Sequence, residues 1–327
     1  MVDTFYRKTI GGELELEFDS LNTYLTDTGR SSLRLILKSD LRNKRFLLPD
    51  YLCWIILDVF DEHKVDYTLY HVNEDLSLPV DEINGQEFDV LYVISYFGKI
   101  SALAGVEIND DQVLIEDNVF LPLFEKPKTI KNWIGFNSFR KISSAAEGSL
   151  IRSTYSLPSE YIKKEAPLFI QSKYKAKATK YEYLNLDQHS ESDYLFLFEN
   201  GERILNEQQD SFYPSNKGLY DLFCYMQNLD EESERRKKNY ELIDKQLIPI
   251  SIGVISKYCC FYVIKIENRD KLRRHLFDEN IFLPAHWPSY KTAKNSLCES
   301  TLSIPLDSRY TQSLPKIIDM IETFLKI

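Results

Sequence analysis

Residues 133–151 read WIGFNSFRKISSAAEGSLI, and much of the structural interpretation follows from this stretch. The apolar run Trp133 to Phe136 predicts a short buried strand, and Ser149 to Ile151 predicts another. Between them lies Lys141, beside Arg140 and ahead of several small residues. Burial and a neighbouring cation both lower the pKa of a lysine, which an amine that attacks a carbonyl group requires. On these residues alone, a surface Arg-Lys pair at a turn stays open as an alternative.

Similar apolar runs alternate with helical or turn-like segments from about residue 46 to residue 153. The further runs are Phe46 to Leu48, Tyr67 to Val72, Val90 to Ile94 and Val113 to Ile115. Residues 51–63, YLCWIILDVFDEH, are apolar almost all round and predict a helix that is buried on most sides. The pattern predicts an α/β domain with a parallel or mixed sheet covered by helices.

A smaller α+β domain is predicted after this large domain. Its first helix is expected at Asp230 to Leu247, because acidic residues precede basic ones as the helix dipole favours. A strand, a helix and a closing helix are expected at Cys259 to Ile266, Arg269 to Asp278 and Leu314 to Ile327. The predicted domains cover 20–225 and 230–327, with residues 1–19 packing near the smaller one. The stretch from Leu157 to Asn228 has weak periodicity and is expected to be irregular.

Composition excludes several classes of function. The formal net charge of -10 over 327 residues argues against nucleic acid as the main partner, since phosphate neutralisation needs a basic face. No apolar stretch approaches the length of a membrane span and the N-terminus lacks a signal-peptide pattern, so we expect a cytoplasmic protein. The five scattered cysteines suit reduced thiols, and no His/Cys spacing suggests a metal site.

Two further motifs carry possible ligand chemistry. Residues 26–33, TDTGRSSL, place a glycine and small hydroxyl residues at the start of a helical run, where backbone N–H groups can bind a phosphate. The same letters also make an ordinary helix cap. Residues 113–117, VLIED, place carboxylates at the end of an apolar strand, where open α/β sheets bind ligands. A solvated strand end is the alternative.

Together these motifs resemble the DegT-type sugar aminotransferases, which are pyridoxal-phosphate (PLP) enzymes of fold type I. In that family the cofactor lysine is followed six residues later by Glu-Gly and a strand, and here Glu147 and Gly148 follow Lys141. Three further segments resemble the phosphate loop, the loop with a ring-stacking aromatic and the aromatic-Gly corner, at residues 29–33, 47–51 and 95–98. Residues 115–117 resemble the strand-end Asp.

The resemblance implies a role for each cofactor contact. Lys141 would form an imine with PLP and move a proton between the substrate carbon and the cofactor, and Asp117 would keep the pyridine nitrogen protonated. The phosphate contacts would be Gly29, Arg30, Ser138 and Ser31, the last mainly through its backbone N–H. Tyr51 is the candidate for stacking on the ring and Trp54 comes next, although strict alignment places Cys53 there.

The substrate side departs from the family pattern. Phe120 stands where the family usually carries Gln or His, and the family's Asn-Tyr-Arg stretch has no clear counterpart near residues 211–217. The candidate substrate contacts are Tyr96, Phe120, His286 and Trp287. Residues 285–288, AHWP, either line the substrate mouth or form a structural loop. The lysines between Lys173 and Lys180 either meet a diphosphate or form a solvated helix face.

The leading interpretation is an aminotransferase that moves an amino group from an amino acid, with glutamate expected, to a nucleotide-linked keto sugar in polysaccharide biosynthesis. Another reaction on the same cofactor, a lyase or dehydratase, is the second candidate because of Phe120. A non-catalytic relative is the third. The resemblance also implies a homodimer, because in the family each active site is completed by the partner subunit, and the 13% aromatic content could supply an interface.

Overall fold

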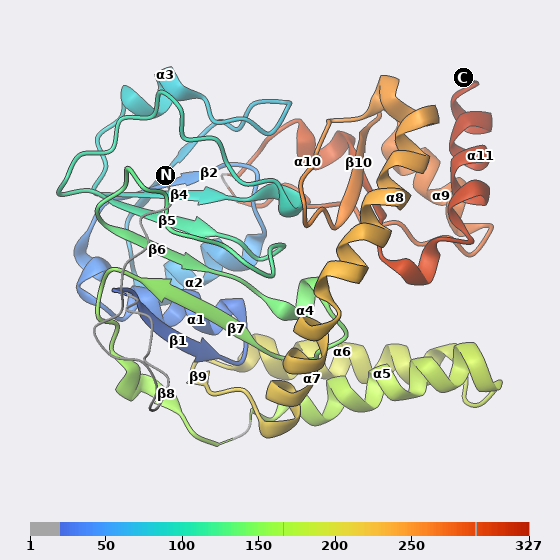
Figure 1. Ribbon diagram of the computed structural model, residues 1–327, viewed down its shortest axis with the longest axis horizontal. Helices are drawn as coiled ribbons and strands as arrows, with labels where there is room; N and C mark the ends of the chain where they lie inside the picture. Colours follow the sequence, from blue (N-terminus) through green and yellow to red (C-terminus); the bar gives the residue numbers. More distant parts are fainter. Residues whose placement is uncertain (1–19, 166, 292, 327) are drawn as a thin grey trace, which may run out of the picture.

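The computed structural model describes residues 20–165, 167–291 and 293–326. Its centre is a seven-stranded mixed sheet in the order β1-β7-β6-β5-β4-β2-β3 (Figure 1). The strands are Asn22–Thr26, Phe46–Pro49, Tyr67–Tyr70, Val90–Ile94, Val113–Asp117, Trp133–Phe136 and Ser149–Ser153 for β1 to β7. The six predicted strands are confirmed. β1 was not predicted because it lies at the sheet edge and is largely exposed at its start.

Strand direction brings the predicted motifs together. β7 pairs antiparallel with both β1 and β6, whereas the other pairs in this sheet are parallel. The carboxyl ends of the remaining six strands therefore lie at one edge of the sheet, where open α/β sheets bind ligands. The segments that follow β1, β2 and β6 carry Thr28, Cys53 and Ser138 to this edge, and Asp117 ends β5 there.

Helices cover the sheet, as predicted. α1 (Gly29–Leu37) and α2 (Trp54–His63) pack against each other, and the short helices α3 (Val80–Asn84) and α4 (Phe139–Ile142) follow β3 and β6. All residues of β2, β4, β5 and β6 are buried. Continuous burial without alternation is typical of strands covered on both faces, so the interior of this sheet forms the main core.

The expectation of irregular structure between Leu157 and Asn228 is wrong. This stretch contains α5 (Phe169–Leu186), α6 (Glu191–Glu207), α7 (Asn216–Gln227) and two short strands, β8 (Ile162–Lys163) and β9 (Ser211–Phe212). α5 and α6 form a hairpin that extends beneath the C-terminal part of the chain (Figure 1). The buried side of α5 includes Lys173 and Thr179, so apolar periodicity, the signal on which the expectation depended, is weak there.

The C-terminal part contains the four predicted elements, which are α8 (Leu229–Leu247), β10 (Phe261–Lys265), α9 (Arg269–Phe277) and α11 (Leu314–Leu325). It also contains α10 (Leu297–Ser300) and β11 (Thr301–Pro305), which were not predicted. Apolar residues of α8, β10, β11 and α11 form a second core. The domain boundaries at 225 and 230 stay a prediction, and the expected packing of residues 1–19 lies outside the described residues. Within the described ranges, no helix is both long and apolar enough to cross a membrane.

Candidate active site

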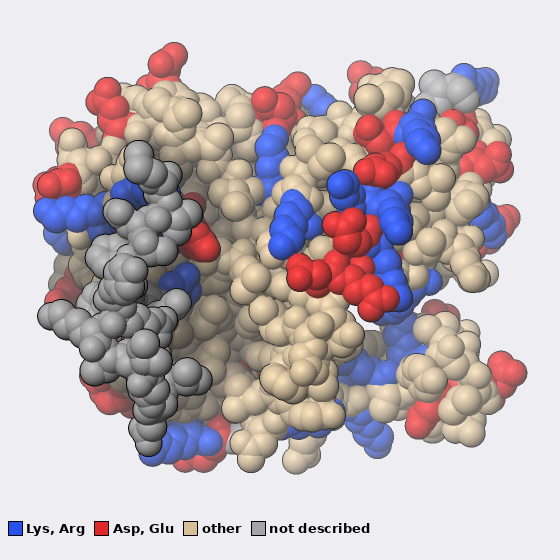
Figure 2. All heavy atoms as spheres, in the orientation of Figure 1, with Lys and Arg blue, Asp and Glu red and all other residues tan. Residues whose placement is uncertain are grey.

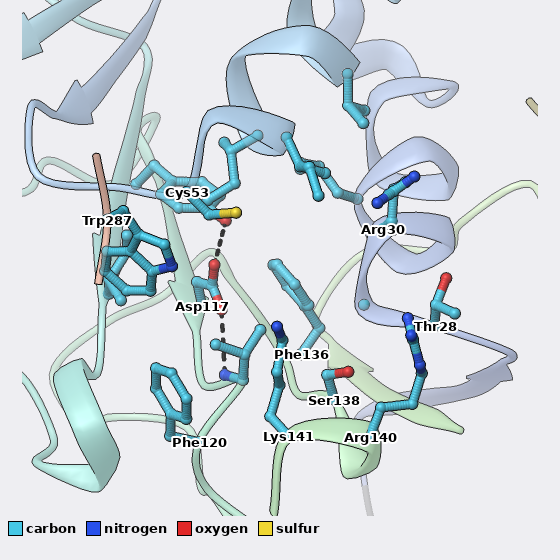
Figure 3. A pocket seen from close by; sticks show the side chains of 18 of the residues that line it. Thr28, Arg30, Cys53, Asp117, Phe120, Phe136, Ser138, Arg140, Lys141 and Trp287 are labelled. Carbon is cyan, nitrogen blue, oxygen red and sulfur yellow. Dashed lines mark hydrogen bonds between the residues drawn. The ribbon is translucent and has the colours of Figure 1, made fainter. Parts of the chain in front are cut away.

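A cavity lies at the edge of the sheet where the strand ends converge. Its polar lining comprises Thr28, Arg30, Tyr92, Asp117, Ser138, Arg140, Lys141 and Glu202, and its apolar lining includes Val119, Phe120, Phe136 and Trp287. Figure 3 shows Arg30, Ser138 and Arg140 at one end and Phe120 and Trp287 at the other. Asp117 and Lys141 lie between these ends. The cavity therefore has a cationic end and an aromatic end, with a carboxylate and an amine between them.

Asp117 is the last residue of β5 and is 3% exposed. Its carboxylate accepts hydrogen bonds from the hydroxyl of Tyr92 at 2.7 Å and from the backbone N–H of Val119 at 3.1 Å. Burial raises the pKa of Asp117 to about 6, although these hydrogen bonds and the charge of Lys141 act in the opposite direction. A cationic group bound against this carboxylate would offset the cost of its burial.

Lys141 lies on α4, directly after β6, and its side chain extends into the cavity (Figure 3). The expectation of a buried lysine is wrong for the single chain, because Lys141 is exposed and also lines a second cleft that borders α4. The guanidinium of Arg236 on α8 donates to the carbonyl of Ile142 at 2.9 Å. This contact connects the backbone next to Lys141 with the C-terminal part of the chain.

The N-terminus of α1 forms the cationic end of the cavity. Gly29 permits close approach there, since an added Cβ would lie 3.3 Å from both the carbonyl oxygen of Asn137 and Cβ of Ser138. No acceptor among the described residues bonds the backbone N–H groups of Gly29 and Arg30. A helix N-terminus with unpaired N–H groups favours an anion, and a phosphate in particular.

Charged side chains reinforce this end. Glu202 on α6 accepts from Arg140 at 2.9 Å and from Lys173 at 2.6 Å. Although burial acts to raise the pKa of Glu202, the two cations outweigh it and hold the value at about 2. Burial and the nearby Arg34 lower the pKa of Arg30 to about 10. Because the single carboxylate of Glu202 faces several cations, this end of the cavity carries excess positive charge.

Four of the predicted site residues do not line the cavity. Two of them, Ser31 and Tyr51, were expected to contact the cofactor. The backbone N–H of Ser31 was expected to bind the phosphate, but it donates to Oγ1 of Thr28 at 3.1 Å. Thr28 therefore caps the helix with this bond. Tyr51 is fully buried and its hydroxyl bonds the carbonyl of His286 and Oγ1 of Thr301. Cys53 lines the cavity instead, at the position that strict alignment indicated.

The other two, Tyr96 and His286, lie behind the aromatic wall. The hydroxyl of Tyr96 donates to the backbone carbonyl of Tyr51, and Nδ1 of His286 lies 3.0 Å from Oγ of Ser303. Burial lowers the pKa of His286 to about 3, with Lys141 acting in the same direction, so this imidazole is neutral. Trp287 and Phe120 do line the cavity, with ring centroids 6.2 Å apart.

Sequence reasoning missed three polar groups of the cavity. Arg140 was noticed only as a neighbour of Lys141, and its pairing with Glu202 was not foreseen. Glu202 lies on α6, in the stretch expected to be irregular, and no motif marked it. Tyr92 is one of five consecutive buried residues in β4, where its hydroxyl gave no separate signal.

No group of three or more His, Cys, Asp or Glu residues in the described ranges could hold a metal ion.

No family model matches the sequence, and no curated protein matches it either. Solved structures do match. A DegT DnrJ EryC1 StrS aminotransferase from Brucella abortus is 14% identical, covers 92% of this chain and 85% of its own, and has a TM-score of 0.61. PseC of Helicobacter pylori, an aminotransferase involved in pseudoaminic acid biosynthesis, is 11% identical, with 93% and 87% covered and a TM-score of 0.62.

A third match is Spr1654 from Streptococcus pneumoniae, described as a sugar aminotransferase and solved in its PMP form. It is 13% identical, with 92% of this chain and 87% of that chain covered and a TM-score of 0.63. Identities this low establish the fold alone. The chain therefore has the fold of the DegT-type aminotransferases, fold type I, which confirms the fold that the sequence motifs predicted.

Proposed function

We propose that this protein is a PLP-dependent aminotransferase acting on a keto sugar. The observation that carries the proposal is that one cavity contains Lys141, Asp117 and the cationic N-terminus of α1. PLP has an aldehyde, a basic ring nitrogen and a phosphate, and its recognition needs an amine, a carboxylate and an anion site. The cavity offers one of each, in an order that suits a single ligand.

The residues fit this cofactor on two separate counts. Asp117 is buried, and a protonated ring nitrogen would supply the cation that its carboxylate lacks. Gly29 lets the loop at Ser138 pack closely, because a Cβ added to Gly29 would lie 3.3 Å from Cβ of Ser138. The unpaired N–H groups at this helix start are available to a phosphate. When bound, the cofactor supplies an electron sink for the pair of electrons left on the substrate carbon when a proton is removed.

Each of these side chains then has a task. Nζ of Lys141 would hold the cofactor covalently, and its free amine would move a proton at the substrate carbon. Asp117 would keep the ring nitrogen charged. Phe120 and Trp287 exclude water from the aromatic end, because both are packed into a cluster with Phe97 and Phe261.

The finer part of the proposal concerns substrate and assembly. The acceptor is a keto sugar linked to a nucleotide, the donor is glutamate, and the pathway is polysaccharide biosynthesis; the sequence resemblance and the fold of known sugar aminotransferases support this choice. A homodimer is proposed because the resemblance to the DegT-type family implies a site completed by the partner subunit. Its support here is the set of exposed apolar side chains on α5, α6 and α7.

A lyase or dehydratase on the same cofactor is the second candidate. Phe120 favours it, since an apolar ring replaces the Gln or His expected beside the substrate, and it is 2% exposed within an aromatic cluster. The two functions differ in what an amino donor does. Only an aminotransferase accepts the amino group of glutamate onto its cofactor and later passes it to a carbonyl substrate.

Visible absorption of the PLP-loaded protein tests the proposal. Glutamate alone should remove the band of the bound aldehyde form, and a keto sugar nucleotide should restore it. The Lys175→Gln variant, which changes an exposed residue outside the cavity, should behave in the same way. A band that persists with every amino acid tested would favour the lyase, and a protein that retains no PLP would contradict both functions.

A further inference from the structure

A second cleft borders α4, and Arg140, Lys141 and Ile142 of this helix line it. It is about 670 Å³ in volume, within the range of roughly 300–1,000 Å³ typical of small-molecule sites. It lies between α5, α8 and the segment 305–309, and Figure 2 shows the hollow beside the outer end of the α5–α6 hairpin, with Lys and Arg atoms at its edge. Arg140 and Lys141 line both the cleft and the cavity, so the two hollows are neighbours on either side of these residues.

The cleft is strongly basic. Its cations are Arg140, Lys141, Lys177, Lys180, Arg236 and Arg309, and its carboxylates are Glu232 and Asp307. Both carboxylates are already engaged, because Glu232 accepts from Arg236 at 3.0 Å and Asp307 accepts from Arg309 at 2.6 Å. The charge of the remaining cations is therefore not neutralised within the cleft.

Lys177 and Lys180 on α5 have no ion pair in the described part of the chain, and neither has Lys141 on α4. Neither lysine of α5 has a carboxylate within ion-pair distance in the described part of the chain, and Lys180 lies over the ring of Tyr194 at 5.6 Å. Burial lowers the pKa of Lys177 to about 8, and Arg140, Arg309, Lys173 and Lys180 add to the effect as like charges. A partly buried ammonium group among like charges is unfavourable unless an anion joins it.

The four lysines noted in the sequence therefore differ. Lys173 is buried and donates to Glu202 at 2.6 Å and to the carbonyl of Phe198 at 3.0 Å, so its charge is already paired. Lys175 is exposed and lies outside the cleft. Lys177 and Lys180 are three residues apart on α5, and this spacing places both on the face that lines the cleft.

We propose that this cleft binds the diphosphate of the amino acceptor through Lys177 and Lys180, with Arg309 at its rim. This inference rests on the proposed function, because it places the acceptor's charged part in the cleft while its carbonyl reaches Lys141. Several unpaired cations match a diphosphate better than the single charge of a carboxylate. The N-terminus of α1 remains available for the phosphate of the cofactor.

Calorimetric titration of inorganic pyrophosphate into the PLP-loaded protein tests this site. Wild-type protein and Lys175→Gln should bind pyrophosphate equally. Lys177→Gln should bind about tenfold more weakly, and Lys177→Arg should retain most of the affinity, because charge rather than shape is recognised. Thermal unfolding of each variant serves as the control for folding. Binding should weaken with salt and should not be displaced by glutamate.

Three outcomes would overturn the inference. They are the absence of pyrophosphate binding, equal binding by Lys177→Gln, and displacement by glutamate, which would assign the cleft to the donor's carboxylates. The experiments distinguish this inference from the proposed function. If pyrophosphate binding depends on Lys177 but the cofactor does not respond to glutamate, the aminotransferase is rejected and the anion site is retained. If the cofactor responds to glutamate but pyrophosphate binding does not depend on Lys177, only the anion site is rejected.

Discussion

At the scale of single residues, Asp117 is the group whose surroundings say most about its ligand. It is 3% exposed, forms no ion pair with the described residues, and accepts hydrogen bonds only from Tyr92 and the backbone of Val119. Burial raises its pKa from 3.8 to about 6. A carboxyl group whose pKa is raised in the folded state contributes stability below its unfolded pKa, and that contribution is lost as pH rises through the folded value.

Asp117→Asn should therefore change the pH dependence of stability in the cofactor-free protein. A rise of about two pKa units corresponds to about 3 kcal/mol, which wild-type protein should lose between about pH 4 and pH 7 and the variant should not. Glu116, whose pKa burial raises to about 7, titrates in both proteins and cancels in the comparison. PLP should restore stability to wild-type protein at neutral pH and much less to the variant. Parallel urea-unfolding profiles for the two proteins would contradict this account of Asp117.

At the scale of elements, the Glu147-Gly148 pair connects the segment that carries Lys141 to neighbouring elements. Glu147 is buried and accepts from the backbone N–H of Ser215 at 2.8 Å and from its hydroxyl, so it holds the start of α7. Gly148 has φ of +109° and its carbonyl accepts from the N–H of Phe139 on α4 at 3.0 Å. The pair therefore joins α7 and the helix that carries Lys141 to the start of β7.

Gly148→Ala should destabilise the fold and weaken PLP retention. An added Cβ would lie 2.7 Å from Cδ1 of Leu222, and the positive φ adds strain, for a combined cost on the order of 2 kcal/mol or more. Gly253→Ala is the matched control, since Gly253 has φ of +70° but nothing within 4 Å of its Cβ position. Denaturant unfolding and the PLP dissociation constant should show a larger effect for Gly148→Ala, and equal effects would mean that Leu222 does not matter.

Local sequence patterns predicted most strands of the sheet and the candidate residues at their ends. They could not predict contacts between elements that are distant in the sequence. Asp117, Ser138 and Lys141 were chosen from their places at the ends of apolar strands and from the family resemblance, and all three line the cavity. α5 was missed because Lys173 and Thr179 interrupt its buried stripe. Glu202 was missed because its role depends on Arg140, which is 62 residues away in sequence. Tyr51 was preferred to Cys53 on residue type, whereas the turn after β2 directs Cys53 to the cavity.

At the scale of the whole molecule, α5, α6 and α7 expose more large apolar side chains than a solvated surface needs. They include Leu184, Leu186, Leu195, Phe196, Leu219, Tyr220 and Phe223. Phe196 is 68% exposed and lies on the face of α6 that also carries Glu202 and Asn206, which contact Arg140 and Arg30. A second copy packed on this face would cover apolar surface next to the cavity.

Phe196→Asp should convert the expected dimer to a monomer and weaken PLP binding, because a charge would be placed in the apolar interface. Phe282→Asp, at a residue that is 61% exposed but lies in the C-terminal part, should leave the dimer unchanged. Sedimentation velocity at micromolar concentration gives the oligomeric state of each. A wild-type monomer with full activity would contradict the proposed assembly.

The central claim is that Lys141 carries the cofactor, and borohydride reduction of the PLP-loaded protein followed by peptide mapping tests it most directly. Reduction should attach the cofactor to the peptide that contains Lys141, and Lys141→Ala should take up no label there. Lys173 and Lys177 lie close enough to the site to serve as internal controls and should remain unmodified. Labelling of either one in place of Lys141 would contradict the account.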